Sequence, residues 1–455
     1  MRQAFALALA VVACTGGAKV HSLSPASGLG ATPGGAQDIG FARKEIDAGR
    51  MPRADAFLTE GLLSEHDLPV DGAACTAPLC IRPGLVEAPS LASGATELWL
   101  HLGMTTSTPR EQLKRPPLDL VVAIDKSSSM SVDMKETNAA VAALIQGLDP
   151  ADRVAIFAFD TKIHEVHPLG PIKDTGALTA RVKQLGAGGD WQIQPAIEHA
   201  YKIAGSADGK GRMKRVAVLS CGYPTVSAQR EDAFSKAVLA GGEQGIGMTF
   251  VGVLLGFHPD LAKLLGDAKG GSFHFADRLE TIEKVFASDL DLMMTPVAYD
   301  LALSLQLAPG YKVSEVYGLP GTGDTKTVDM KVATVFFSKN RGAIVARLTR
   351  EANAGTAAGN VRFAYKPREG APHDETVALV PGDAAGARKA VALVNLAEQL
   401  RAIANAYAKN ERTIAAKLAD ELIAYLEPQA TDDGMKRELE MVRKVRAIIG
   451  PNAQN

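Results

Sequence analysis

Residues 118–130 read LDLVVAIDKSSSM, and this stretch decides the fold. Its first seven residues form a nearly continuous apolar run, which is typical of a strand buried on both faces of a sheet. From this strand to about residue 290, short apolar runs alternate with helical stretches. That alternation predicts an α/β fold built on a doubly wound, mostly parallel sheet. In such sheets, binding sites form beyond the carboxyl ends of the strands.

The other elements follow from the period of the apolar residues. Further strands of this sheet are expected at Val154–Phe159, Arg215–Ser220, Met248–Leu254 and Ser272–Phe275. Helices are expected at Met134–Leu148, Thr179–Leu185, Pro195–Ala204, Glu231–Gly241, Asp260–Ala268 and Leu279–Asp289. From Tyr299 to about Val380, strand-like runs separated by turn residues predict an antiparallel β-sandwich. After Ala387 the apolar spacing becomes helical, which predicts a C-terminal helical segment.

The end of the first strand carries a candidate metal site. Asp125, Ser127 and Ser129 follow one another at D-x-S-x-S spacing. A turn at this point can aim one carboxylate and two hydroxyls at a common centre. Such hard oxygen ligands suit Mg²⁺, Mn²⁺ or Ca²⁺. The spacing therefore predicts a divalent cation as cofactor.

This region resembles the von Willebrand factor type A domain and its metal-ion-dependent adhesion site. The resemblance covers about residues 115–290 and rests on several short motifs. They are the apolar strand with D-x-S-x-S and Met130, Asp152-Arg153-Val154, Phe159-Asp160, Gly188-Gly189, Gly222 and GGSFHFAD at 270–277. It implies a Rossmann-like sheet and a protein partner whose carboxylate fills the open coordination position of the metal. By resemblance, Asp125, Ser127 and Ser129 are ligands.

The sequence departs from the family site in two loops. The family's Gly-Gly-Thr is Gly188-Gly189-Asp190 here, and its Thr-Asp-Gly is Ser220-Cys221-Gly222. One carboxylate is lost at Cys221 and one is gained at Asp190, so two remain when Asp125 is included. We therefore add Asp190 to the expected metal ligands, although it is not a family residue. A neutral thiol is a poor ligand for a hard ion.

Three readings of this altered site stay open. A rearranged metal site survives, or the site is degenerate and the fold binds its partner without metal, or Cys221 serves a softer metal or reacts as a thiol. Lys126 lies inside the motif, where its ammonium either repels or replaces a cation or points to solvent. Trp191 and Cys221 are candidate partner contacts, and packing on the upper face of the domain is the alternative for Trp191.

The beginning of the chain predicts export. Arg2 precedes an apolar run that ends at Ala13, about ten residues long and too short to span a bilayer. The run ends in Val-Val-Ala-Cys14, which resembles a bacterial lipoprotein cleavage box, and in that family the cysteine carries lipid. We expect a lipid-anchored protein of the bacterial cell envelope that meets the membrane only through this anchor. Plain secretion with an incidental cysteine is the alternative.

Cysteine usage fits an exported protein. Four cysteines in 455 residues exclude a scaffold built from disulfides. Cys75 and Cys80 lie in one short loop and are predicted to form a disulfide, with two unpaired thiols as the alternative. Cys221 is left over.

Lys and Arg total 49 and Asp and Glu 51, so the net charge of −2 argues against a globally basic nucleic-acid binder, and we expect no nucleic-acid partner.

The chain divides into six expected segments. They are an export signal with lipobox at 1–14, a flexible tether at 15–40, an N-terminal segment of the β-domain at 41–114, the von Willebrand factor A domain at 115–292, a β-sandwich at 293–385 and C-terminal helices at 386–455. This order is similar to that of exported or lipoprotein members of the superfamily in bacteria. The similarity implies a sandwich with strands from both sides of the inserted domain, including Glu97–Leu102.

We expect an envelope protein that binds a protein partner through an altered adhesion site. A structural assembly scaffold that needs no metal is the alternative. A remote alternative is an enzyme with Cys221 as nucleophile, for which the sequence offers no evident histidine partner. Because no catalytic motif or acid/base pair stands out, no enzymatic activity is expected.

Overall fold

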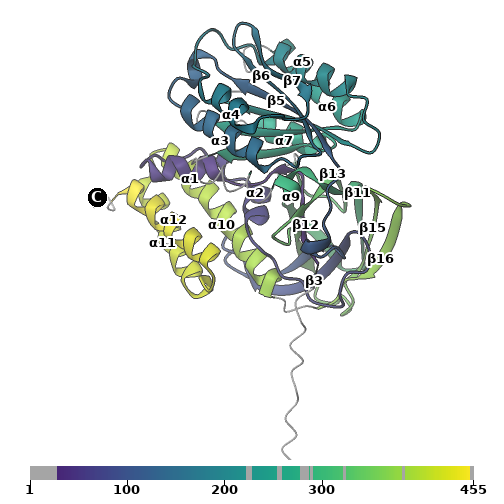
Figure 1. Cartoon of the computed structure of the whole chain (residues 1–455). Coiled ribbons are helices and arrows are strands. Elements are labelled where there is room, and N and C mark those ends of the chain that lie inside the picture. Colours follow the sequence, from purple (N-terminus) through teal and green to yellow (C-terminus); the bar gives the residue numbers. More distant parts are fainter. Residues whose placement is uncertain are drawn as a thin grey trace, which may run out of the picture.

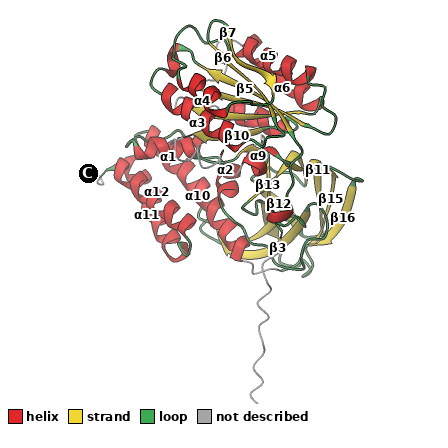
Figure 2. Ribbon diagram, viewed as in Figure 1, coloured by secondary structure: helices red, strands yellow, loops and turns green. Residues whose placement is uncertain are grey.

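The computed structural model of the chain describes residues 28–221, 228–253, 259–276, 286, 290–320, 324–381 and 385–450. Figure 1 shows three parts: a layered α/β part at the top, a strongly curved sheet at the lower right and a group of helices at the lower left. Figure 2 shows the same parts by secondary structure. The predicted signal, Cys14 and the first half of the predicted tether (15–27) lie outside the described residues, as does the helix predicted at Leu279–Asp289 except for Phe286. The second half of that tether is not flexible as predicted, because it contains two buried strands that pair with both sheets.

The upper part is built on a seven-stranded sheet of order β2-β10-β9-β8-β5-β6-β7. Its strands are β2 (Gly35–Ala36), β5 (Leu118–Asp125), β6 (Arg153–Phe159), β7 (Ile163–Gly170), β8 (Met213–Ser220), β9 (Ile246–Val253) and β10 (Ser272–Ala276). Every pair of neighbours is parallel except β6 and β7. The mostly parallel sheet predicted from the sequence is confirmed.

Helices cover both faces of this sheet. They are α3 (Met134–Gly147), α4 (Thr175–Lys183), α5 (Ile193–Ser206), α6 (Ala228–Glu243) and α7 (Pro259–Asp267). The central strand β5 shows why its sequence is apolar throughout. Val121 and Ala123 pack into the core with α5, whereas Leu120 and Val122 pack into a second core with α3. The sheet is therefore doubly wound, as predicted.

The sequence did not predict the edge strand β7. Its residues, IHEVHPLG, are exposed or half-buried and pair only with β6, with two irregularities in the register. A strand at the edge of a sheet can carry polar residues on both faces. It therefore lacks the apolar run by which the inner strands were found.

The lower right part is an antiparallel sheet of nine strands, of order β12-β14-β4-β1-β13-β11-β15-β16 with β3 also paired to β4. The strands are β1 (Gly30–Pro33), β3 (Cys80–Pro89), β4 (Thr96–Thr105), β11 (Pro296–Leu307), β12 (Tyr311–Tyr317), β13 (Asp329–Ser338), β14 (Ala343–Arg350), β15 (Gly359–Pro367) and β16 (His373–Ala378). Leu100, Leu303, Ile344 and Phe363 from four strands share one core. The sandwich-like layer is thus one continuous sheet folded over its own core.

The N-terminal segment ties the two sheets together. Strand β1 lies between β4 and β13 of the antiparallel sheet, and β2 pairs with β10 of the parallel sheet. Close packing explains the glycine that opens β1, since a Cβ at Gly30 would lie 2.0 Å from the carbonyl oxygen of Asn340. The α/β part is thus inserted between β4 and β11, as the resemblance implied.

The lower left part contains the C-terminal helical segment predicted from the sequence. Its helices are α10 (Ala385–Ala408), α11 (Arg412–Leu426) and α12 (Asp433–Ile449), and the short α9 (Leu290–Met294) precedes β11. The regularly spaced apolar residues of the three long helices are mostly buried in one core. Tyr407, Leu418 and Tyr425 are only partly buried at its margin. Among the described residues, no helix combines the length and the apolar character needed to cross a bilayer.

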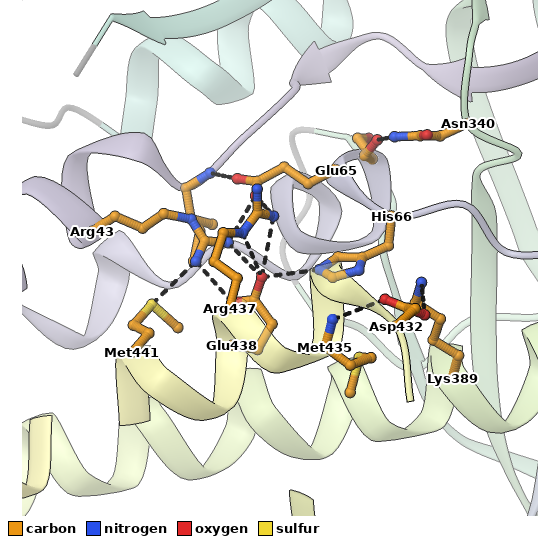
Figure 3. A network of polar contacts seen from close by, with 12 residues as sticks. Arg43, Glu65, His66, Asn340, Lys389, Asp432, Met435, Arg437, Glu438 and Met441 are labelled. Carbon is orange, nitrogen blue, oxygen red and sulfur yellow. Dashed lines mark hydrogen bonds and ion pairs between the residues drawn. The ribbon is translucent and has the colours of Figure 1, made fainter. Parts of the chain in front are cut away.

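Charged side chains join the beginning of the chain to its last helix (Figure 3). Arg43 of α1 (Gly40–Asp47) contacts Glu65 of α2 (Thr59–Glu65) at 2.7 Å and Glu438 of α12 at 2.8 Å. His66 contacts the same Glu438 at 3.0 Å, and both side chains are buried. Arg437 adds a contact to Glu65. These pairs hold α1 and α2 against α12 across almost the whole length of the chain.

The cysteines fall into a bonded pair and a free thiol. Cys75 and Cys80 are joined by a disulfide, with their Cα atoms 5.8 Å apart, where β3 begins. Cys221 is a buried free cysteine directly after β8. The bonded pair matches the pairing expected from the sequence, and Cys221 lies at the loop end of the parallel sheet.

Candidate functional site

The candidate site lies where β5, β6 and β8 end. Asp125 is the last residue of β5 and is completely buried. Its Oδ1 accepts a hydrogen bond from the backbone N–H of Ser127 at 2.9 Å, and its Oδ2 accepts one from the Ser220 hydroxyl at 2.6 Å. Each carboxylate oxygen therefore accepts one hydrogen bond from the chain itself.

The two serines of the motif meet Cys221. The hydroxyl oxygens of Ser127 and Ser129 are 2.8 Å apart, and Ser129 Oγ lies 3.0 Å from Cys221 Sγ. Cys221 Sγ is also 3.8 Å from Asp125 Oδ2. The one-turn 3₁₀ helix at Ser128–Met130 directs these groups inward. The structure thus brings Asp125, Ser127, Ser129 and Cys221 together, in agreement with the D-x-S-x-S spacing.

The thiol of Cys221 is protonated at neutral pH. Burial raises its pKa to about 11, the nearby Asp125 carboxylate adds to the rise, and the hydrogen bond with Ser129 offsets part of it. A thiolate is the form of cysteine that attacks electrophiles or binds metals. At neutral pH this position therefore adds a neutral side chain to the site.

Asp190 does not join this group, contrary to the expectation that it faces Asp125 across a pocket. The Asp190 side chain is exposed, and among the described residues it forms no hydrogen bond or ion pair. Its backbone N–H donates to Thr161 Oγ1 at 2.8 Å, and the preceding Gly189 has a φ of 77°. The loop conformation therefore leaves this carboxylate in solvent.

Lys126 is held inside the loop cluster. Its Nζ lies 2.5 Å from Asp160 Oδ2, and both side chains are largely buried. His164 Nε2 lies 2.9 Å from the other oxygen of Asp160, which also accepts a hydrogen bond from the backbone N–H of Lys162. Burial alone would raise the pKa of Asp160, but the hydrogen bonds from Lys126 and His164 hold it well below its usual range. Asp160 was not among the expected site residues, because only the fold places it beside Lys126.

The donor set does not fit a hard divalent cation. Magnesium and calcium favour several carboxylate or carbonyl oxygens. Here one carboxylate, Asp125, is buried with both oxygens engaged, and a neutral thiol lies where the family has an acid. Within the described part of the chain, no group of three or more acidic, histidine or cysteine side chains is placed to hold a metal ion. Of the expected ligands, Asp125, Ser127 and Ser129 lie together, whereas Asp190 is exposed to solvent.

Two apolar side chains are exposed around the site. Val132, three residues after Ser129, is 84% exposed, the highest value for a large hydrophobic residue in the described part of the chain. Ile163, at the start of β7, is 39% exposed. Trp191 is half-buried, packs against the core and donates from Nε1 to Ser220 Oγ at 3.4 Å. The tryptophan thus packs against the core and also borders the site. Val132 could not be predicted as a site residue, because a single valine carries no signal in the sequence.

Comparison with known proteins agrees with this geometry. The family model of the von Willebrand factor type A domain matches residues 119–288. These residues form a von Willebrand factor type A domain. The match spans the strands whose ends carry Asp125, Asp160 and Cys221.

Relatives of the whole chain are distant. An uncharacterized protein of Escherichia coli, YfbK, is 24% identical over 207 residues, which are 44% of this chain and 36% of YfbK, so the chain matches about a third of that relative. A solved von Willebrand factor type A protein from Catenulispora acidiphila covers 83% of this chain with 97% of its own, at 14% identity and a TM-score of 0.51. The VWA2 paralog of ArnB from Sulfolobus acidocaldarius covers 82% of this chain with 97% of its own, at 15% identity and a TM-score of 0.41. The likeness to the Catenulispora structure concerns the fold alone.

Proposed function

We propose that this chain is a cell-envelope protein that binds a protein partner at the loop end of its von Willebrand factor A domain. Domains of this family commonly mediate protein–protein interaction. In this chain the loops after β5, β6 and β8 gather at one end of the parallel sheet, which is where ligands bind in open α/β sheets. The partner surface is therefore assigned to these loops.

One observation carries the assignment to this end of the molecule. Val132 is almost fully exposed and projects from the loop that holds the motif serines. A lone exposed hydrophobic residue is ordinary, but here Ile163 and Trp191 flank the same loops. Interface centres are enriched in aromatic side chains. Val132, Ile163 and Trp191 together supply the apolar contact that a protein partner would cover.

Placement in the envelope rests on the sequence. Residues 1–14 combine a short apolar run with Cys14 at a lipobox-like position, which supports export and lipidation. The Cys75–Cys80 disulfide is consistent with an oxidising compartment. The proposed protein is held at a membrane by lipid on Cys14 and presents its binding domain away from it.

A catalytic role for Cys221 receives no support from the geometry. Its Sγ contacts Ser129 and Asp125, and no imidazole lies within hydrogen-bonding distance among the described residues. Without a base, a thiol whose pKa is about 11 stays protonated. We propose a binding protein without enzymatic activity.

Site-specific photo-crosslinking tests the proposal. A photoreactive phenylalanine analogue is introduced at Val132 or Ile163 of the full chain in its native host, and at the exposed Lys331 of β13 as control. We expect a common protein adduct from both loop positions and none from Lys331. Val132→Glu should weaken the adduct formed from position 163, whereas Lys331→Glu should not. Adducts of equal yield from all three positions, or none from the loops, would reject this surface.

A further inference from the structure

We infer that the von Willebrand factor A site of this chain works without a divalent cation. The inference rests on the proposed function and concerns how that same site recognises its partner. In the family, as the resemblance implies, a bound metal receives a carboxylate of the partner. The contacts of Asp125, Lys126, Asp160 and Cys221 at the loop end differ from those that would hold such a metal.

The carboxylates at the loop end are either engaged by other groups of the chain, buried, or exposed to solvent. Four acidic residues lie in the described parts of these loops: Asp125, Asp133, Asp160 and Asp190. Asp133, directly before α3, is buried. Asp125 is buried, and Ser127 and Ser220 donate to its two oxygens. Asp160 is neutralised by the ammonium of Lys126 at 2.5 Å. Asp190 is in solvent, without a contact to the motif serines in the described structure. In the described structure these carboxylates do not gather, with each other or with histidine and cysteine, into a group of three or more that could hold a metal ion.

The serine hydroxyls and the thiol of the site contact one another. Ser127, Ser129 and Cys221 form a chain of contacts at 2.8 and 3.0 Å. The hydroxyls that would bind a metal are thus engaged with each other and with sulfur. Sulfur is a soft donor and a poor ligand for hard ions such as Mg²⁺. Replacing the family's acid by Cys221 removes a negative charge from the centre of the site, and nothing in the described structure restores it.

The ammonium of Lys126 lies inside the loop end. It is part of the D-x-S-x-S loop, and its side chain is only 16% exposed. Its backbone N–H donates to the Phe159 carbonyl, and its carbonyl accepts from the N–H of Gly188. The loops after β5 and β6 and the loop before α5 are therefore held together by hydrogen bonds and by the Lys126–Asp160 ion pair. A positive charge that belongs to the protein keeps the loops together without a bound ion.

This arrangement changes the kind of partner that fits. Without a metal there is no open coordination position, so an acidic residue is not the anchor of the partner. The exposed groups are instead the apolar Val132, the hydroxyl-bearing Ser128 and Ser131, and the carboxylate of Asp190. We infer a partner segment that covers Val132 and is bound equally well in the presence of a chelator.

Thermal unfolding of the purified chain tests the inference without knowledge of the partner. Melting curves are recorded in millimolar Mg²⁺, Mn²⁺, Ca²⁺ or Zn²⁺ and in chelator at matched ionic strength, with titration calorimetry of each ion. A ligand that binds the native state raises its stability by mass action. We expect coincident curves and no specific heat. A rise in Tm with any of these ions that is lost in Asp125→Asn would overturn the inference.

Restoring the family residues provides the positive counterpart. Cys221→Asp combined with Asp190→Thr returns the acid and the hydroxyl that the sequence lacks. We expect this double variant to gain Mg²⁺-dependent stabilisation, whereas Cys221→Ala, which removes the thiol without adding charge, should not respond. If the double variant folds and remains indifferent to metal, these two positions are not the cause and the assignment fails.

The two proposals fail in different ways. Loss of the loop-specific cross-links would reject the partner surface and leave the metal curves unaffected. A metal response of the wild type would reject the metal-independent site, while the cross-links from Val132 could still form. The melting experiment alone therefore decides whether the site requires a cation.

Discussion

Single side chains set the charge and the shape of the loop end. Lys126 and Asp160 form an ion pair between two loops, and Gly189 packs directly against Asp160. The hydrogen bonds to Asp160 depress its pKa in the folded state. A carboxyl group whose pKa is lower in the folded than in the unfolded chain stabilises the fold at any pH above its unfolded pKa. This stabilisation is lost as the pH falls through its folded pKa. The pair therefore contributes at neutral pH and loses its contribution only in strong acid.

Lys126→Met should lower the free energy of unfolding by ~2 kcal/mol at neutral pH, since a hydrogen bond to a charged group is lost. The deficit should shrink as pH falls below ~3.9, because the carboxyl of the variant takes up a proton there while that of the wild type does so only at lower pH. Urea unfolding across this pH range measures it. Lys162→Met, which changes the exposed neighbour, serves as control. A deficit independent of pH would show that the pair is not its cause.

Gly189→Ala should destabilise the loop by ~1–3 kcal/mol. Its φ of 77° is costly for any residue with a Cβ, and that Cβ would lie 2.9 Å from Cγ of Asp160. Gly186→Ala is the matched control, because its Cβ would meet no atom within 4 Å. Denaturant unfolding of the two variants compares them, and equal stabilities would contradict the strained loop.

At the scale of elements, apolar periodicity predicted what the core requires. Strand β5 and helices α10 to α12 have long apolar patterns, and their buried faces agree with those patterns. Strand β7 and the contacts of Lys126 could not be predicted this way, because an edge strand and a polar loop carry no such period. The direction of Asp190 depends on Gly189 and Thr161, which only the folded loops bring together.

The contact between the first and last helices depends on Glu438. Its side chain is completely buried between Arg43 and His66. Removing one partner of a buried ion pair leaves an uncompensated charge, so Glu438→Gln should cost ~3–5 kcal/mol. Glu440→Gln, at an exposed position of the same helix, should cost less than ~1 kcal/mol. Unfolding free energies of both variants measure the difference, and similar values would show that α12 is not held by this network.

The disulfide at the start of β3 should contribute modestly. Cys75 and Cys80 are separated by five positions. In the chain-entropy account, a loop this short gives less than the ~3 kcal/mol of a 15-residue loop. The double variant Cys75→Ala and Cys80→Ala should therefore stay folded, with a loss below that figure in denaturant unfolding. Free thiols in unreduced, exported protein would contradict the pairing.

At the scale of the whole molecule, Arg215 joins the binding domain to the antiparallel sheet. It is fully buried on β8 and donates to the carbonyls of Gly270 and Met294, while its guanidinium lies 5.4 Å from the ring centroid of Phe336 on β13. Among the described residues no carboxylate pairs with it. Burial lowers its pKa to about 10, so it remains charged at neutral pH. The hydrogen bond to Met294 and the contact with the Phe336 ring thus reach from the parallel sheet to the neighbouring part.

Arg215→Met should weaken this junction by ~1–3 kcal/mol, because buried carbonyls lose their donor. We expect the α/β domain and the rest of the chain to unfold in more separated transitions by differential scanning calorimetry. Lys214→Met, a change at the adjacent position of the same strand, should keep the wild-type profile. An unchanged profile for Arg215→Met would show that the domains are joined by other contacts.

The central claim is that a protein partner binds the loop end of the von Willebrand factor A domain without a metal ion. It is tested most directly by the yield of the partner cross-link from position 132, measured in magnesium and in chelator. The account predicts the same adduct with the same yield in both conditions. An adduct that disappears in chelator and returns when magnesium is added would contradict it.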